Sequence, residues 1–103
     1  MNKEWEAVKL FHEKFGLPVS EVPTMLSAQR SRSRGTWMLE EVAEFLTADS
    51  IYEQSDAMID LIYFALGTLV EMGVQPEGLF NIVQQANMSK LWEDGKPRHN
   101  AIF

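Results

Sequence analysis

Apolar side chains recur at helical spacing in four segments of the chain, and none of its apolar runs shows the two-residue alternation of a strand. The predicted helices cover residues 4–15, a stretch that begins between 27 and 33 and ends near 48, then 51–72 and 76–88. Gly16 and Gly73 follow two of these segments, where glycine commonly ends a helix. Pro76 suits the first turn of the last one. The pattern therefore predicts an all-α fold, an antiparallel bundle of four main helices.

The predicted helix over 51–72 carries apolar side chains around nearly its whole circumference. Such a helix is expected to be largely buried. The 103 residues form one predicted domain, 1–103, and three further short helices cannot cover that helix fully within one copy. We therefore expect the chain to self-associate as a homo-oligomer, a dimer or a tetramer.

Besides Glu71, six carboxylates lie on the two middle helices: Glu40, Glu41 and Glu44, then Glu53, Asp56 and Asp60. The second group stands at i, i+3 and i+7, so it forms one stripe in an otherwise apolar surface, and like charges at this spacing repel one another. Such a stripe is unfavourable unless water or a cation compensates it. The short link makes the two helices an antiparallel pair with adjoining acidic faces. Hard divalent cations prefer several oxygen ligands on rigid supports, so the pattern predicts a Mg²⁺-dependent phosphate enzyme.

The spacing Glu41-x-x-Glu44 followed by Glu53-x-x-Asp56 resembles the ExxE…ExxD signature of the MazG-like all-α nucleoside triphosphate pyrophosphohydrolases. That superfamily also includes phosphoribosyl-ATP pyrophosphohydrolase and dimeric dUTPases. The resemblance covers nearly the whole chain and points to the small bacterial and phage branch, through Phe11-His12, Phe15 to Pro18, Arg34, Asp56 to Tyr63, Gly67-Thr68 and Asn87 to Leu91. The chain departs from many relatives in its short link, with eight residues between Glu44 and Glu53, and in an abbreviated tail after Pro97.

The resemblance implies hydrolysis of a (deoxy)nucleoside triphosphate between its α and β phosphates, giving a monophosphate and pyrophosphate, in a house-cleaning or pool-control role. Mg²⁺, for which Mn²⁺ could substitute, would be bound by the four matched acids: Glu41, Glu44, Glu53 and Asp56. The implied catalytic residues are Glu40 and Glu41, with Glu40 as an outer ligand or as the residue that orients the attacking water. Such ions activate water and offset charge on phosphates.

Six residues are candidates for substrate contacts: Arg34, Trp37, Asp60, Tyr63, Asn87 and Lys90. Arg34 meets phosphate oxygens or forms a structural ion pair with Glu41 or the first helix. Trp37 is placed to stack on a base. Tyr63 holds a carboxylate or water, or packs in the core with its hydroxyl at the rim.

The last two candidates lie where the fourth helix ends. Asn87 contacts the nucleotide or only terminates the helix, and Lys90 binds triphosphate or is a solvated charge. His12 is expected to be a structural histidine because no second histidine stands at ligand spacing. Trp92 is expected to anchor the tail.

The charge and composition of the chain limit the kinds of partner and site that we expect. With 15 acidic and 9 basic residues the net charge is −6, which disfavours a nucleic-acid duplex but is compatible with polyphosphate bound through metal ions. The absence of cysteine excludes disulfides, thiolate metal sites and cysteine nucleophiles. No signal peptide and no membrane-spanning stretch are expected, so the cytoplasm is the expected location.

Two alternatives to a nucleoside triphosphate enzyme stay open. One is a catalytically silent helical module that dimerises and presents its acids outward to a basic protein. The other, within the enzyme class, is a phosphoribosyl-ATP pyrophosphohydrolase. The acids must converge inward for either enzyme, whereas an interaction module needs them spread outward or solvated on a surface.

Overall fold

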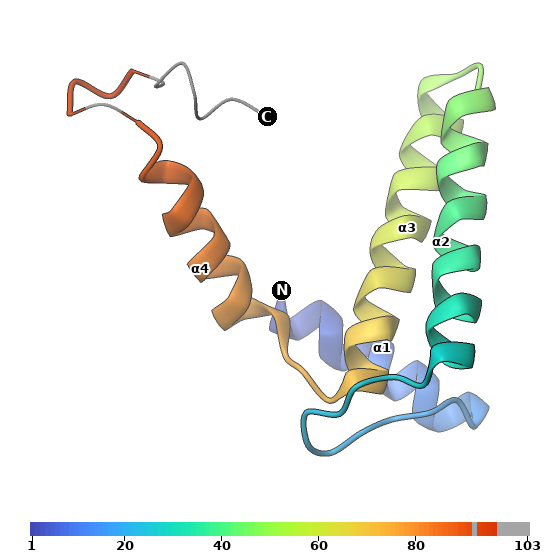
Figure 1. The fold of residues 1–103 in the computed structure, drawn as a ribbon. Coiled ribbons are helices and arrows are strands. Elements are labelled where there is room, and N and C mark those ends of the chain that lie inside the picture. The colour runs from blue at the N-terminus through green and yellow to red at the C-terminus, as the bar shows by residue number, and fades with distance from the viewer. Residues whose placement is uncertain (92, 97–103) are drawn as a thin grey trace.

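The computed structural model describes residues 1–91 and 93–96, and these contain four helices (Figure 1). The helices are α1 (Asn2–Phe15), α2 (Ala28–Thr47), α3 (Ile51–Met72) and α4 (Pro76–Met88). The expected all-α class is confirmed. Both bounds of α3 and α4 agree with the predicted ranges, and α1 begins two residues earlier than predicted.

The helix ends follow from local chemistry. Ser27 and Ser50 are the N-caps of α2 and α3, and their hydroxyls accept hydrogen bonds from the backbone N–H groups of Arg30 and Glu53, each at 3.1 Å. Gly73 ends α3 with a φ of 69°. A Cβ at Gly73 would also lie 2.8 Å from the carbonyl oxygen of Ser20, so the loop before α2 packs closely on this end of α3.

Helices α2 and α3 form the expected antiparallel pair, and α1 lies across the base of this pair (Figure 1). The buried apolar core is small and lies where α1 meets the C-terminal half of α3. It consists of Trp5, Val8, Leu66 and Val70, with Val19 and Leu69 packed against it. The far half of the α2–α3 pair therefore extends beyond the core.

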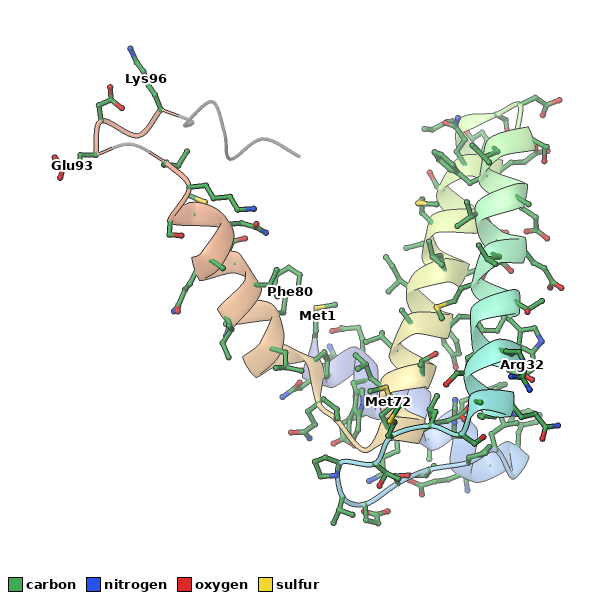
Figure 2. The ribbon with its side chains drawn as sticks, in the orientation of Figure 1. Met1, Arg32, Met72, Phe80, Glu93 and Lys96 are labelled. Carbon is green, nitrogen blue, oxygen red and sulfur yellow. The ribbon has the colours of Figure 1, made fainter. Side chains whose placement is uncertain are left out.

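Helix α4 projects away from the other three helices. It packs on α1 and extends away from the α2–α3 pair, and the side chains along it stand clear of that pair (Figures 1 and 2). The radius of gyration is accordingly 16.5 Å, against about 13 Å for a compact domain of 100 residues. The expectation that α3 is largely buried is wrong for a single chain, because Ile51, Ile59 and Ile62 remain 68%, 62% and 47% exposed.

Among the described residues, no single helix is both long enough and apolar enough to cross a membrane. Helices α3 and α4 together satisfy length and composition, but they are bent by 115° at their junction.

Candidate active site

Three carboxylates from two helices converge between α2 and α3. Oxygen atoms of Glu41, Glu44 and Asp60 lie within 4.8 Å of one another. Glu41 and Asp60 are partly buried, whereas Glu44 is exposed. The arrangement is possible because the short link at residues 48–50 turns the chain back on itself, so that one acid of α3 faces two of α2.

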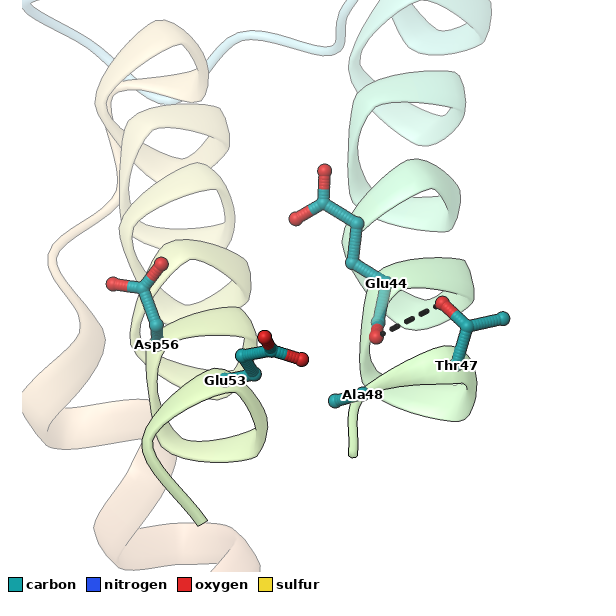
Figure 3. Close-up of a pocket in the computed structure, with 5 residues that line it drawn as sticks. All are labelled: Glu44, Thr47, Ala48, Glu53 and Asp56. Atoms are coloured by element: carbon teal, nitrogen blue, oxygen red, sulfur yellow. Dashed lines mark hydrogen bonds between the residues drawn. The ribbon is translucent and has the colours of Figure 1, made fainter. Parts of the chain in front are cut away.

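A pocket of about 250 Å³ adjoins this cluster toward the link. Its lining includes Glu44, Glu53 and Asp56, and Figure 3 shows the three carboxylates around the space between the two helices. Glu53 also accepts a hydrogen bond from the Asp49 backbone N–H at 3.2 Å, so this acid helps to cap α3. Glu44 thus belongs both to the three-carboxylate cluster and to the pocket.

Crowding changes the ionisation of the cluster. Burial raises the pKa of Glu41, as do hydrogen bonding with Glu44 and the charges of Glu44, Asp60 and Asp56. Burial likewise raises the pKa of Asp60, helped by the charges of Asp56 and Glu44. Carboxyls with a raised pKa bind more protons in the folded chain than in the unfolded one, so the cluster costs folding stability as the pH rises through those pKa values.

One atom of the cluster gives a test of whether the site fits a cation. The Oε2 of Glu41 is buried and has no hydrogen-bond partner among the described residues. A buried carboxylate oxygen without a donor is unfavourable, and a bound cation would satisfy it. The donor set consists of carboxylate oxygens only, which suits a hard divalent cation. The residues present therefore fit a metal of the Mg²⁺ class.

The predicted acids do not all join this cluster. Asp60, expected to contact substrate, is one of its three members. Glu53 and Asp56, expected as metal ligands, line the adjoining pocket instead. Glu40 is exposed on α2 and outside the cluster.

Beyond the acids, facing residues of α2 and α3 follow in layers toward the base of the pair. The successive pairs are Glu41 with Asp60, Trp37 with Phe64, Arg34 with Gly67, and Arg30 with Glu71. The acidic layer is thus followed by an aromatic layer, in which the Trp37 and Phe64 ring centroids are 6.0 Å apart, and then by two layers that contain arginines.

A second pocket of about 240 Å³ opens at the aromatic layer. Its lining consists of four aromatic rings, Phe11, Trp37, Tyr63 and Phe64, together with His12, Leu17 and Arg34. Tyr63 is 41% exposed and meets Phe11 edge-on, with their ring centroids 5.8 Å apart. The ring of Trp37 already has the guanidinium carbons of Arg30 and Arg34 5.2 Å from its centroid.

Arg34 is buried in an ion-pair network. Its Nε donates to Oε2 of Glu71 at 2.5 Å, and its Nη2 lies 3.1 Å from Nε2 of His12 on α1. A contact with the first helix was one of the two structural partners expected for Arg34. The other, Glu41, is not its partner, because Glu71 takes that place.

Sequence reasoning missed Glu71. Its side chain is fully buried and accepts hydrogen bonds from Arg30 at 2.7 and 2.9 Å as well as from Arg34. Burial acts to raise the pKa of Glu71, but the hydrogen bonds and charges of the two arginines outweigh it and lower that pKa. The available signal was an acid within the apolar C-terminal part of α3, which needs a cationic partner when buried.

The residues expected at the end of α4 are not brought to the acids within one chain. Asn87 lies in the last turn of α4, and Lys90 follows it. That helix extends away from the α2–α3 pair (Figure 1). Trp92 and the tail after residue 96 lie outside the described residues.

A family model described as phosphoribosyl-ATP pyrophosphohydrolase matches residues 8–87. The chain belongs to this family. The match spans α2, α3 and all six candidate carboxylates, and it confirms the expected MazG-like superfamily. Among curated proteins, none matches the chain. Membership indicates a pyrophosphohydrolase that acts on nucleotides, in a family that is typically metal-dependent.

Proposed function

We propose that the chain hydrolyses a (deoxy)nucleoside triphosphate between the α and β phosphates, in a Mg²⁺-dependent reaction that yields a monophosphate and pyrophosphate. The observation that carries this proposal is the convergence of Glu41, Glu44 and Asp60, with one buried Glu41 oxygen left without a donor. Acids that only lie on a solvated face or a docking surface gain nothing by pointing toward one another, because like charges then repel. The family match supports the same chemistry.

In this proposal Glu41, Glu44 and Asp60 hold the cation, and Glu53 and Asp56 complete an acidic site in the adjoining pocket. When bound, Mg²⁺, or Mn²⁺ in its place, supplies positive charge that offsets the charge on the phosphates. Glu40 stands next to Glu41 along α2 and is exposed, so it can reach a water molecule from the solvent side and accept its proton. In this arrangement Glu41, Glu44 and Asp60 hold the cation, and Glu40 orients the water.

The nucleoside is proposed to lie over the aromatic layer. This layer is one helical turn from the acids, so a substrate whose phosphates lie at Glu41 and Asp60 extends its base toward Trp37 and Tyr63. Trp37 already has arginines beside its ring, and Phe11 is stacked on Phe15 with their ring centroids 4.4 Å apart. The exposed ring of Tyr63 is therefore better placed for stacking on a base.

A nucleotide panel tests the proposal. Canonical, modified and phosphoribosyl nucleotides are incubated with the purified chain in Mg²⁺, in Mn²⁺ and in chelator, and pyrophosphate is measured separately from orthophosphate. We expect pyrophosphate and a monophosphate, and no turnover in chelator. Orthophosphate with a diphosphate would contradict the cleavage position. Activity confined to phosphoribosyl-ATP would select the substrate that the family description favours. Inactivity throughout would favour a silent interaction module.

We also propose that the chain works as a homo-oligomer in which α4 of one copy packs on the α2–α3 pair of another. Leu79, Phe80, Ile82 and Val83 on α4 are each more than half exposed, and large apolar side chains grouped in this way commonly mark an interaction surface. The α2–α3 pair offers an apolar groove of about 380 Å³ beside Phe45, Met58 and Ile59. Such packing would carry Asn87 and Lys90 toward a partner's acids.

The oligomer proposal predicts that light scattering gives at least twice the mass of one chain, and that Ile82→Glu gives a mass nearer to one chain because it places a charge in an apolar contact. Gln84→Glu is the matched control, since Gln84 is an exposed polar residue of the same helix. A wild-type mass of a single chain at assay concentrations would contradict the proposal, as would equal effects of the two variants.

A further inference from the structure

The arginine below the aromatic pocket has donors that the protein does not use. Arg34 is 3% exposed, and its Nε and Nη2 are taken by Glu71 and His12. The hydrogen bonds and ion pairs that Arg34 makes with the described residues use Nε and Nη2, and none of them uses Nη1. A Cβ at position 67 would lie 2.9 Å from that nitrogen, so the glycine at this point of α3 leaves the room that the guanidinium occupies.

The network that holds Arg34 carries an excess of positive charge. Nδ1 of His12 lies 2.8 Å from the carbonyl oxygen of Pro18, which can only accept, and Nε2 lies beside Arg34, which can only donate, so Nδ1 is the donor and Nε2 the acceptor. Glu71 then supplies one negative charge against the two of Arg30 and Arg34. The side chain of Arg30 is 29% exposed, so solvent reaches one of the two positive charges, whereas that of Arg34 is 4% exposed and gains from an acceptor that reaches its remaining nitrogen. The pocket lined by Arg34 is the place where such an acceptor can enter.

The position of this arginine suits the far edge of a base. Arg34 precedes Glu41 by seven residues on α2, which is about 10 Å along a helix. A nucleotide with its phosphates at the acids would place its sugar and base across that distance, with the base among Phe11, Trp37 and Tyr63. The polar edge of the ring would then lie over the unused Nη1.

We propose that Arg34 selects bases by donating a hydrogen bond from Nη1 to the carbonyl oxygen at C4 of a pyrimidine or C6 of a purine. The site then favours oxo bases, such as uracil and hypoxanthine, over the amino bases cytosine and adenine, whose NH₂ groups present a donor to a donor. Adenine substrates, phosphoribosyl-ATP included, would be disfavoured. Glu71, His12 and Gly67 act as positioning residues that fix the guanidinium. This inference rests on the proposed function, because it places the phosphates at the acids.

The test compares substrates that differ in one group. The kcat/KM of the wild type is measured for dUTP against dCTP and for dITP against dATP, and the deoxynucleoside triphosphate of 2-pyrimidinone, which lacks the 4-oxo group, is added. We expect each oxo substrate to exceed its partner by about tenfold or more, since a hydrogen bond to a charged group is of that size. Ratios near one would overturn the base selection while leaving the hydrolase intact.

A binding readout separates the two proposals. Calorimetry with the non-hydrolysable α,β-methylene analogues of dUTP and dCTP measures selection even if no nucleotide is turned over, which would itself contradict the proposed function. Tighter binding of the dUTP analogue supports the role of Arg34, and equal binding overturns it.

Two variants test whether the guanidinium of Arg34 is responsible for the selection between bases. Gly67→Ala brings a methyl group against Nη1 of Arg34 and against Nε2 of His12, each 2.9 Å from a Cβ at that position, so it displaces the guanidinium. Arg34→Lys keeps a charge near Glu71 but removes the fork of donors. Each is expected to bring the dUTP to dCTP ratio close to one, whereas Arg32→Lys, an exposed position on α2, leaves it unchanged. A folded variant of either kind with the full wild-type ratio would overturn the assignment. If neither variant folds, the substrate pairs on the wild type decide.

Discussion

Glu41→Gln, Glu44→Gln and Asp60→Asn are each expected to lower pyrophosphate release by about 100-fold or more. Each replaces a charged carboxylate by a neutral amide in a cluster whose members lie within 4.8 Å of one another, so a cation needed in the transition state is bound more weakly. The amide versions keep the size of the side chain, so packing is preserved. Glu53→Gln and Asp56→Asn are expected to show losses of the same order because both line the adjoining acidic pocket.

The matched control is Glu13→Gln. Glu13 is an exposed acid on α1 that belongs neither to the acidic cluster nor to the lining of the two pockets beside it, so its replacement changes the net charge by the same amount outside the proposed site. Turnover should be measured in saturating Mg²⁺ and again in a Mg²⁺ titration, so that weakened metal binding is distinguished from slower chemistry. Small losses that are equal at all these positions, Glu13 included, would show that the acids contribute only a diffuse field.

Glu71 is unsuitable as a control, although it lies outside the motif of acids and on the same helix. It is fully buried between Arg30 and Arg34. Removing one partner of a buried ion pair leaves uncompensated charge and commonly costs about 3–5 kcal/mol. Lost activity in a Glu71 variant would therefore report unfolding of the base of the α2–α3 pair, not a role in catalysis.

The fold could be predicted from sequence where local signals were strong. Apolar periodicity and the terminating Gly73 fixed α3, and Pro76 marked the first residue of α4. The direction of α4 could not be predicted. A helical pattern says that an apolar face will be covered, but it does not say whether the covering surface belongs to the same copy.

The candidate site could be predicted as a group of acids but not as a set of ligands. Spacing on each helix placed the acidic faces together, whereas the pairing across helices depends on how one is rotated and shifted against the other. That register placed Asp60 opposite Glu41. The same register buries Glu71 beside Arg30 and Arg34. This pairing could not be predicted, because ion pairs between residues some 40 positions apart leave no periodic signal in a sequence.

The most direct measurement of the central claim is the effect of Mg²⁺ on folding stability. In chelator, Asp60→Asn should melt at a higher temperature than the wild type, since folding raises the pKa of Asp60 and its ionised form therefore costs stability at neutral pH. Mg²⁺ binds the folded site and not the dispersed acids of the unfolded chain, so it should stabilise the wild type by about 2.7 kcal/mol at a hundredfold excess over its dissociation constant.

Asp60→Asn should lose most of that stabilisation, so that its advantage shrinks or reverses in Mg²⁺. NaCl of matched ionic strength is the control, because it screens charges without occupying the site. We expect a melting shift that is specific to Mg²⁺ and much larger in the wild type than in Asp60→Asn. A shift that is the same in Mg²⁺ and in NaCl, and the same in both proteins, would contradict the metal site and the hydrolase built on it.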